Sequence, residues 1–530
     1  ENAHFIERMV YSCNPTNWLY RCCVAILSLL SANSSAQSYR LHVDTIAPLA
    51  SAQSIDTLQI ALPDSLDGCR WVENAPWNKD KHPWRAAAQV VGINASLLAF
   101  DYYVLHANFA KVTSRTLKRN LQLNKWFWDA DVFHTNMFFH PYHGNLFFNA
   151  ARSNGMNFWQ SIPYTFAGDL LWEIAGENEL PSINDALSTG IGGLAIGECT
   201  YRLSSIVYDQ RLQGWSRVVR EILGAAINPI RGLNRVIKGE AWKVRQKHYL
   251  YHDVSRFPVQ LSFSVGGRYV DTRHNATGGF TSPYVHFEVE YGDAFGQETR
   301  PYDYFKTDVA LVLGHQQEIV NHLQILGQLF ATSVRDTKGM QTRFGLYQHF
   351  NYDNANERHG GIPPYQLSEA ASVGIGWMCR IPNKAKKVAF QQSVFLNAML
   401  LGGAWSDYLG EPYHRTYNMG SGFTAYSFTS LHLPRQCSLS FDTRFFRMYS
   451  WRGYEEVPAG TPHEEFSAQG EHSQTSVWML RPTFKLPLWK QWGLQLSGTY
   501  YHRATHYKYH PNAKATTYEW RMGLLYQLPR

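Results

Sequence analysis

The second half of the chain alternates apolar and polar residues with a period of two, from about residue 258 to the C-terminus. One face of the last segment carries Tyr518, Trp520, Met522, Leu524, Tyr526 and Leu528. Glu519, Arg521 and Gln527 fall on the opposite face. Because successive side chains of a β-strand point to opposite sides, each such segment predicts a strand with an apolar face and a polar face.

About twelve segments show this pattern, and their number favours a membrane barrel. An even count places both ends of a bacterial single-chain barrel on the periplasmic side. The segments lie near residues 258–270, 283–292, 302–314, 318–332, 341–353, 365–381, 387–404, 418–433, 436–451, 474–486, 492–503 and 515–528.

Short and long connections alternate between the later segments, as in barrels with short periplasmic turns and long outer loops. The short ones are 382–386, 434–435 and 487–491, and the long ones are 353–364, 405–417, 450–473 and 503–515. The 293–301 connection is also expected on the outer side, and the strand limits near it leave the count open by two. A soluble double sheet would share the alternation, but the loop asymmetry and the aromatic strand ends favour a transmembrane antiparallel β-barrel.

The beginning of the chain predicts a secretory signal peptide. Arg21 precedes an apolar run over residues 22–30, and small residues at positions 34 and 36 fit cleavage after Ala36. We expect the signal peptide to start at Met9 and interpret residues 1–8 as an upstream extension added when the gene start was assigned. Residues 37–84 are polar and without a period, so we expect a periplasmic linker or arm there.

Composition agrees with a membrane location and argues against nucleic acid as a partner. Aromatic residues make up 15% of the chain, which fits interfacial girdles. The net charge of +7 includes no Lys/Arg block. No segment has the roughly 18 apolar residues that a spanning helix needs, so strands must carry the chain into the membrane. The cysteines beyond the leader form no metal or disulfide spacing: Cys69, Cys199, Cys379 and Cys437.

Residues 85–240 are predicted to form a helical domain, because apolar positions recur there at spacings of three and four. Helices are expected over 86–110, 145–175, 183–208 and 214–237. Ser182 is expected to cap the third helix, with Asp185 as its capping-box partner. Three glycines in that helix predict the close approach of another backbone: Gly190, Gly193 and Gly197.

The most distinctive motifs lie within this helical domain. They read His140-Pro-Tyr-His-Gly144, Asn149-Ala-Ala-Arg-Ser-Asn-Gly155, Trp172-Glu173 and Pro181-Ser-Ile-Asn-Asp185, in this order. The succession resembles an uncharacterised bacterial family, domain of unknown function 3943, over about residues 125–205. The resemblance implies no known activity.

Polar residues among the apolar helices form a candidate site. Its members are His134, Asn136, His140, Asn149, Arg152, Glu173, Glu177, Asp185 and Glu198. In one interpretation a Glu or His acts as general base and Arg152 holds a phosphate or carboxylate of a lipid. In the other, these residues form buried ion pairs and caps that lock the helices together.

Two further expectations concern single residues of this site. If Pro163 does not break the helix expected there, Arg152 and Glu173 lie on one continuous helix, about 60° apart around its axis. His140 and His143 have a spacing that fits a metal, but Pro141 and Gly144 indicate a turn, and no third ligand is marked. Neither a metal nor another cofactor is therefore expected.

The sequence as a whole predicts an outer-membrane protein. A helical domain (85–240), periplasmic or within the lumen, would precede a barrel of about twelve strands (255–530). The expected function is to bind or pass an envelope lipid or small solute. The alternative is an enzyme that modifies envelope lipid or glycolipid through His140, Arg152 and Glu173. Expected partners are outer-membrane lipid or lipopolysaccharide, and the barrel-assembly machinery during insertion.

Overall fold

The computed structural model describes most of the chain beyond residue 80. The described residues are 81–122, 126–129, 131–244, 259–272, 279–296, 300–314, 317–336, 339–355, 363–381, 389–410, 415–433, 437–450 and 470–528. The expected signal peptide, most of the expected linker with Cys69, and the turns at 382–386 and 434–435 lie outside them.

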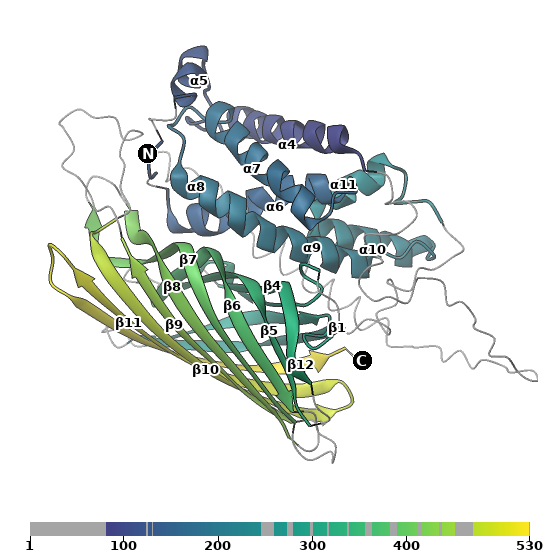
Figure 1. Ribbon diagram of the computed structural model, residues 1–530, viewed down its shortest axis with the longest axis vertical. Helices are drawn as coiled ribbons and strands as arrows, with labels where there is room; N and C mark the ends of the chain where they lie inside the picture. Colours follow the sequence, from purple (N-terminus) through teal and green to yellow (C-terminus); the bar gives the residue numbers. More distant parts are fainter. Residues whose placement is uncertain are drawn as a thin grey trace, which may run out of the picture. The chain divides into compact units, whose positions relative to one another are not determined.

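A helical region precedes the strands, as expected (Figure 1). Its elements are α4 (Pro83–Tyr103), α5 (Ser114–Asn120), the π-helix η5 (Thr135–Phe139), α6 (His140–Arg152), α7 (Phe158–Ala175), α8 (Ile183–Leu187), the π-helix η6 (Ser188–Gly192), α9 (Gly193–Val207), α10 (Gly214–Ile227) and α11 (Pro229–Ile237). No helix in the described part of the chain has the length and apolar character needed to span a bilayer.

The helix expected over 145–175 is in fact two helices, α6 and α7. The chain turns at Gly155, whose φ of 89° suits glycine, and α7 then starts with a capping box. In this box the Asn157 side chain accepts a hydrogen bond from Gln160 N at 2.9 Å. Arg152 and Glu173 therefore belong to different helices, and the expectation of one continuous helix is wrong.

The helix expected over 214–237 is also interrupted, at Asn228. Pro229 has no backbone N–H, and Asn228 caps α11 by accepting a hydrogen bond from Arg231 N at 3.0 Å. By contrast, the expected helix over 183–208 is one uninterrupted run of α8, η6 and α9. A proline after an asparagine thus ends one helix and begins the next.

Of the three predicted glycines, Gly193 lets another backbone, that of α6, approach closely, whereas Gly190 and Gly197 face the side chains of Phe166 and Phe148. A Cβ atom on Gly193 would lie 2.6 Å from Gly144 Cα, and one on Gly144 would lie 1.9 Å from Thr189 O. Such distances are shorter than any van der Waals contact, so only glycine fits at either position. This contact fixes the start of α6, which carries His140, against the helices that follow residue 182.

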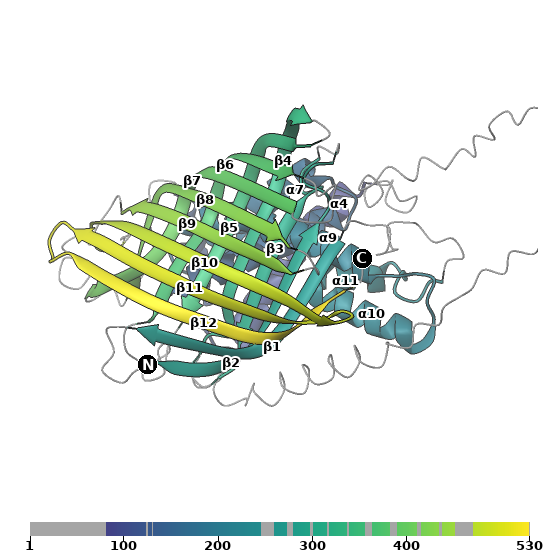
Figure 2. The same cartoon turned by 90° about the horizontal axis from the view of Figure 1, so that it is seen from below.

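Twelve antiparallel strands form a closed barrel in which β1 pairs with β12, so the predicted strand count is confirmed. Figure 2 shows neighbouring strands side by side in order from β6 to β12. The strands are β1 (Val259–Thr272), β2 (Phe280–Tyr291), β3 (Phe305–Val312), β4 (Val320–Asp336), β5 (Gln341–Ala355), β6 (Tyr365–Ile381), β7 (Ala389–Gly410), β8 (Arg415–His432), β9 (Ser438–Tyr449), β10 (Ser473–Trp489), β11 (Trp492–Tyr507) and β12 (Ala513–Gln527).

The connections correct two expectations. The chain crosses the barrel wall once in β1 and returns in β2. The connection between β2 and β3 therefore lies at the same end of the barrel as the start of β1 and the end of β12. Its expected outer position is therefore wrong. Two of the expected long loops are shorter because β7 reaches Gly410 and β11 reaches Tyr507. The added segments, 405–410 of β7 and 503–507 of β11, have no regular alternation of apolar and polar residues, so the sequence pattern does not reveal them.

The outward face of the barrel is apolar and the inward face is polar, as a transmembrane barrel requires. On β12, Trp520, Met522 and Leu524 are 50–61% exposed, whereas Glu519 and Arg521 are buried. The same exposed apolar row continues on other strands, with Phe344, Leu346, Ile375, Trp377, Val394, Leu396, Trp478 and Leu480. The terminal strand therefore has the orientation that its sequence predicts.

Candidate functional site

The barrel interior is crossed by hydrogen bonds between strands that are not neighbours. Arg444 on β9 donates to Asn351 on β5 at 2.6 Å and also to Gln324 on β4. The Arg268 side chain on β1 donates to the Tyr365 hydroxyl on β6 at 3.1 Å. Bonds between distant strands of a closed barrel must pass through its interior, so these side chains fill the lumen at their levels.

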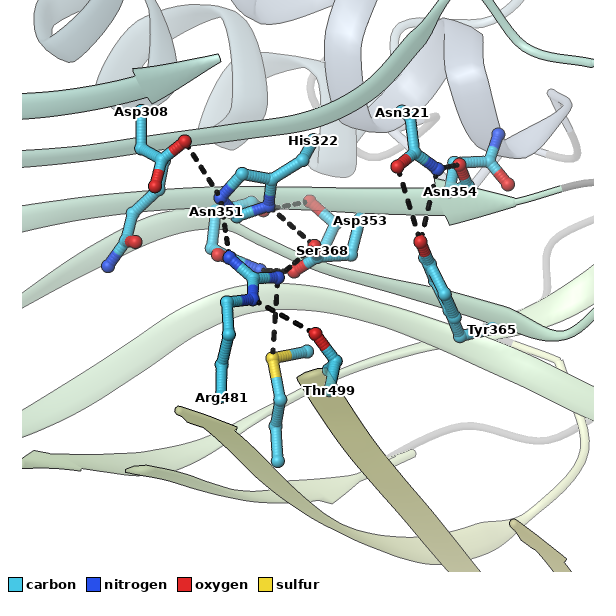
Figure 3. A network of polar contacts seen from close by, with 12 residues as sticks. Asp308, Asn321, His322, Asn351, Asp353, Asn354, Tyr365, Ser368, Arg481 and Thr499 are labelled. Atoms are coloured by element: carbon cyan, nitrogen blue, oxygen red, sulfur yellow. Dashed lines mark hydrogen bonds and ion pairs between the residues drawn. The ribbon is translucent and has the colours of Figure 1, made fainter. Parts of the chain in front are cut away.

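Figure 3 shows another such crossing, around His322. Arg481 on β10 lies 3.3 Å from His322 Nε2 on β4 and 3.7 Å from Asp353 on β5. Asp353 Oδ1 in turn accepts a hydrogen bond from His322 Nδ1 at 2.6 Å. The His322 side chain is 0% exposed and that of Asp353 is 2% exposed. Water therefore does not reach the His322 and Asp353 side chains.

The helical region contacts the opposite, outward face of the same wall. Asn351 and Asp353 point inward, so their neighbours Phe350 and Tyr352 point outward. Phe350 and Tyr352 share an apolar cluster with Phe133, Met137 and other helical residues. Gln348, on the same outward face of β5, donates a hydrogen bond to Ile191 O at 2.7 Å. These contacts lie outside the lumen, beside the exposed apolar row.

Three of the predicted site residues form a buried structural group on α6 and α9. Glu198 accepts hydrogen bonds from Arg152 Nε at 2.7 Å and Nη2 at 2.9 Å, and from Arg202 Nε at 2.8 Å. Asn149 donates to Asn145 Oδ1 at 2.8 Å and Gly197 O at 3.1 Å. The Arg152 side chain is 1% exposed and its guanidinium also donates to Met156 O. Arg152 is therefore enclosed by partners of this chain.

Four other predicted residues gather with carboxylates that sequence reasoning missed. We call Asp129, Asp131, Asp169, Glu173 and Asp185, together with His140, the carboxylate cluster. Asp129 and Asp131 precede η5, His140 begins α6, Asp169 and Glu173 lie on α7, and Asp185 lies on α8. Asp129, Asp169, Glu173 and Asp185 are at most 6% exposed, while the Asp131 side chain is 49% exposed at the rim.

Asparagines tie the cluster together. Asn184 Nδ2 donates to Asp129 Oδ1 and to Asp185 Oδ1, each at 2.9 Å. Asn136 Nδ2 donates to Asp129 Oδ1 at 2.8 Å and to the Tyr417 hydroxyl of β8 at 2.7 Å. His140 Nε2 lies 3.4 Å from Asp185 Oδ1. The amide groups thus hold two carboxylates in place beside one imidazole.

The cap of α8 differs from the expected capping box. Ser182 does cap the helix, accepting from Asp185 N at 3.3 Å. Its own backbone N–H, however, donates to Glu173 Oε2 at 2.6 Å. Asp185 was expected to make that bond, and this expectation is wrong. The Asp185 side chain instead faces Asn184 and His140.

Burial and mutual repulsion change the proton affinity of these groups. Burial raises the pKa of Asp169 to about 7, although the charge of His140 acts in the opposite direction. Burial, together with nearby carboxylates, also raises the pKa values of Glu173, Asp185 and Glu177 well above their usual range. Burial lowers the pKa of His140, but Asp131, Asp129 and Asp169 outweigh it, so the net shift is upward.

His143 behaves differently from its neighbour. Burial and the charge of His140 lower its pKa to about 3, so it is neutral at physiological pH. Its ring lies 4.4 Å from that of Phe147 and 5.1 Å from that of Trp172, centroid to centroid. His143 is therefore part of the aromatic packing of α6 and α7. The expected turn at Pro141 and Gly144 is absent, since both lie within α6.

Two predicted residues remain. Glu177 lies just beyond the end of α7, and its backbone carbonyl accepts a hydrogen bond from Asn120 Nδ2 at 3.5 Å. His134 stands apart. Its side chain is 41% exposed and lies 4.0 Å from Glu318. The missed members Asp129 and Asp131 belong to the Trp126-Phe-Trp-Asp-Ala-Asp131 segment, whose two acids among aromatic residues were a usable signal. Asp169 had no such signal, because it follows a glycine in a helix with few charges. Chemically, the cluster can hold protons or a cation, and it repels anions.

Comparisons with known proteins assign no activity to this chain. No curated protein sequence matches this chain. The solved NanC porin has 9% identity and a TM-score of 0.23, with 50% of this chain and 100% of that chain covered. The KdgM porin has 8% identity and a TM-score of 0.22, covering 50% and 99%. OmpT of Vibrio cholerae has 7% identity and a TM-score of 0.20, covering 51% and 99%.

These structural likenesses are too low to inform on ligand or mechanism. The helical region gives a more specific match. Residues 125–230 match the model of a family described as Domain of unknown function (DUF3943). This range contains η5 to α10 and the whole carboxylate cluster. The resemblance of the motif segment to this family of unknown function is thereby confirmed.

Proposed function

We propose that this protein binds an envelope lipid through its helical region, while the barrel serves as a closed outer-membrane anchor. The observation that carries this proposal is the polarity of helices α7 and α10. Both bury polar residues and expose apolar ones, the reverse of a helix on the surface of a soluble protein. Such helices suit a lipid environment, where charges must pair internally.

Helix α10 has the clearest reversed polarity. Its exposed residues Trp215, Val218 and Ile222 form one stripe and are 82%, 43% and 63% exposed. Its opposite face carries Arg217 and Glu221, whose side chains pair at 2.7 Å and are 7% and 15% exposed. Arg235 of α11 joins them at 2.8 Å from Glu221. The ion pairs thus lie inside the hairpin and the apolar side chains lie outside.

Helix α7 repeats this arrangement next to the carboxylate cluster. Trp159, Phe166 and Leu170 are 55%, 38% and 43% exposed. The buried residues of the same helix include Ser161, Thr165, Gly168, Asp169 and Glu173. Exposed apolar area of this extent marks an interaction surface.

The barrel wall supports lipid rather than a soluble partner as the occupant. On the outward face of β5, Phe344 and Leu346 are 43% and 40% exposed, and Phe350 and Tyr352 further along the same face touch the helical region. The helical region therefore adjoins, near Phe133 and Met137, the wall whose outer side chains face the bilayer. Lipid can cover both the exposed apolar side chains of the barrel and those of the helical region.

Passage of a solute and chemistry on a phosphate receive less support. Side chains cross the lumen at the levels of His322 and Arg444 and narrow any path for a solute there. Arg152, the residue expected to hold a phosphate, already donates to Glu198 through two nitrogens. Binding of lipid to the helical surface is therefore the function that the geometry favours.

Spin labels can test this proposal in the full-length protein in liposomes. Labels on cysteines replacing Ile222 and Val218, in a background without native cysteines, should collide more often with oxygen than with a water-soluble nickel complex. Oxygen concentrates in lipid, and the nickel complex stays in water. A label replacing Arg211, whose side chain is 45% exposed, serves as the water-facing control. Equal nickel accessibility at Ile222 and Arg211 would contradict lipid contact.

A further inference from the structure

We propose that Asp129, His140 and Asp185 bind one divalent transition-metal ion of the Zn²⁺ type. The three residues come from three separate segments: the chain before η5, the first residue of α6, and helix α8. This site is independent of lipid binding at α7 and α10, because no residue of the apolar stripes contributes to it.

The geometry of the three side chains suits one small ion. One ligand atom from each residue lies within 4.8 Å of those from the other two. His140 Nε2 and Asp185 Oδ1 are 3.4 Å apart. Two ligands at bond lengths of about 2.1 Å around a tetrahedral ion are separated by about 3.4 Å, so this pair needs no rearrangement. His140 Nε2 makes no hydrogen bond, which leaves its lone pair available to an ion.

Two buried oxygen atoms next to these ligands also have no hydrogen-bond partner. Asn136 Oδ1 belongs to a fully buried amide whose nitrogen donates to Asp129 Oδ1 at 2.8 Å. Glu173 Oε1 belongs to a carboxyl group with 0% exposure, whose other oxygen accepts from Ser182 N. A buried oxygen without a partner is costly. A cation held by Asp129, His140 and Asp185 would offer its bound water as a partner to such atoms.

The local charge requires a counter-ion. Within the described residues, no lysine or arginine pairs with Asp169, Glu173 or Asp185. Three carboxyl groups at most 3% exposed would have to take up protons in order to stay uncharged. A dication neutralises two of the carboxylates at once, and it does so from the position that His140 and Asp185 already face.

The ligand types select the class of ion. An imidazole with two carboxylates favours a first-row transition metal such as Zn²⁺ over Mg²⁺ or Ca²⁺, which take oxygen ligands alone. Three protein ligands leave a fourth position for water or substrate, as in zinc sites that perform chemistry. Asn184 supplies outer support, since it donates to Asp129 and Asp185 and so orients both carboxylates.

Metal titration of the full-length protein in detergent tests this site. After treatment with a chelator, calorimetric titration with Zn²⁺ should show one site per chain, and Co²⁺ should give the intense visible absorption of a tetrahedral ion. Asp185→Asn and His140→Ala should each weaken Zn²⁺ binding by about 100-fold or more. Asn184→Ala should weaken it by about 10-fold, as expected for the loss of outer support. His134→Ala is the matched control and should bind like the wild type, because His134 lies by Glu318.

Two results would overturn the metal site. One is the absence of stoichiometric Zn²⁺ and Co²⁺ binding to the wild-type chain, a measurement that needs no variant. The other is unchanged Zn²⁺ affinity in Asp185→Asn and His140→Ala proteins that keep the heat-dependent gel mobility of the folded barrel. Neither result affects the spin-label test of lipid contact, so the two proposals fail separately.

Discussion

The full-length protein in a planar lipid bilayer is expected to carry no steady ionic current, even though its barrel has twelve strands. Arg268, Arg444 and Arg481 reach across the lumen to side chains of distant strands. Arg268 and Arg444 have side chains that are 0% exposed. Side chains that are buried and bonded across the interior obstruct the passage of hydrated ions. Single-channel recording at moderate voltage measures this directly.

Removal of these three side chains provides the matched comparison. The triple variant Arg268→Ala, Arg444→Ala and Arg481→Ala should show discrete current steps, because each substitution deletes a group that fills the interior. Heat-dependent gel mobility verifies that the variant barrel is folded. A steady wild-type current equal to that of the triple variant would show that the arginines do not close the lumen.

Replacement of Glu198 by alanine is expected to unfold α6 and α9 while the barrel remains folded. Glu198 is 0% exposed and is the shared partner of Arg152 and Arg202. Without it two buried guanidinium groups lose a carboxylate, and breaking one buried pair of this kind costs about 3–5 kcal/mol. Hydrogen–deuterium exchange should show loss of protection in α6 and α9, with β5 to β12 unchanged.

Two further substitutions serve as controls for Glu198→Ala. Glu198→Gln keeps the shape and some of the hydrogen bonds, so it should lose less protection than Glu198→Ala. Asp101→Ala on α4 removes a carboxyl group from a partly exposed position and should shift stability by no more than about 0.5 kcal/mol. Equal protection in Glu198→Ala and Asp101→Ala would mean that the buried ion pairs do not hold the helices together.

The strands could be predicted because each has two different environments. Lipid on one side and a polar interior on the other require apolar and polar residues to alternate along every strand. Trp520 between Glu519 and Arg521 is an example. Strand ends were less predictable. At the ends of β7 (405–410) and β11 (503–507) apolar and polar residues no longer alternate, so the sequence pattern stops before the strand does.

The helix breaks had local signals that hydrophobic periodicity obscured. Asn157 and Gln160 have the spacing of a capping box, and Asn228 precedes Pro229. Each of these two signals marks the start of a helix within a segment whose apolar residues have a single helical period. Arg152 and Glu173 lie on either side of the first break. They belong to two different helices, so the angle expected between them around one helix axis does not apply.

The carboxylate cluster depends on tertiary contacts that spacing cannot reveal. Asp129 meets Asp185 through the amide of Asn184, and His140 meets them because α6 packs tightly against η6 at Gly144. His140, Glu173 and Asp185 were predicted as polar site residues from their motifs. Their grouping with Asp129, and the separation of Arg152 into a different cluster, required the fold.

The central claim is that the apolar faces of the helical region contact lipid in the envelope. Photo-crosslinking in cells tests it most directly, with a photoactivatable amino acid in place of Trp215 and, as control, in place of Arg211. The account predicts that Trp215 yields adducts with lipid and that Arg211 yields none. Adducts of Trp215 with a protein alone, or no adducts at either position, would contradict it.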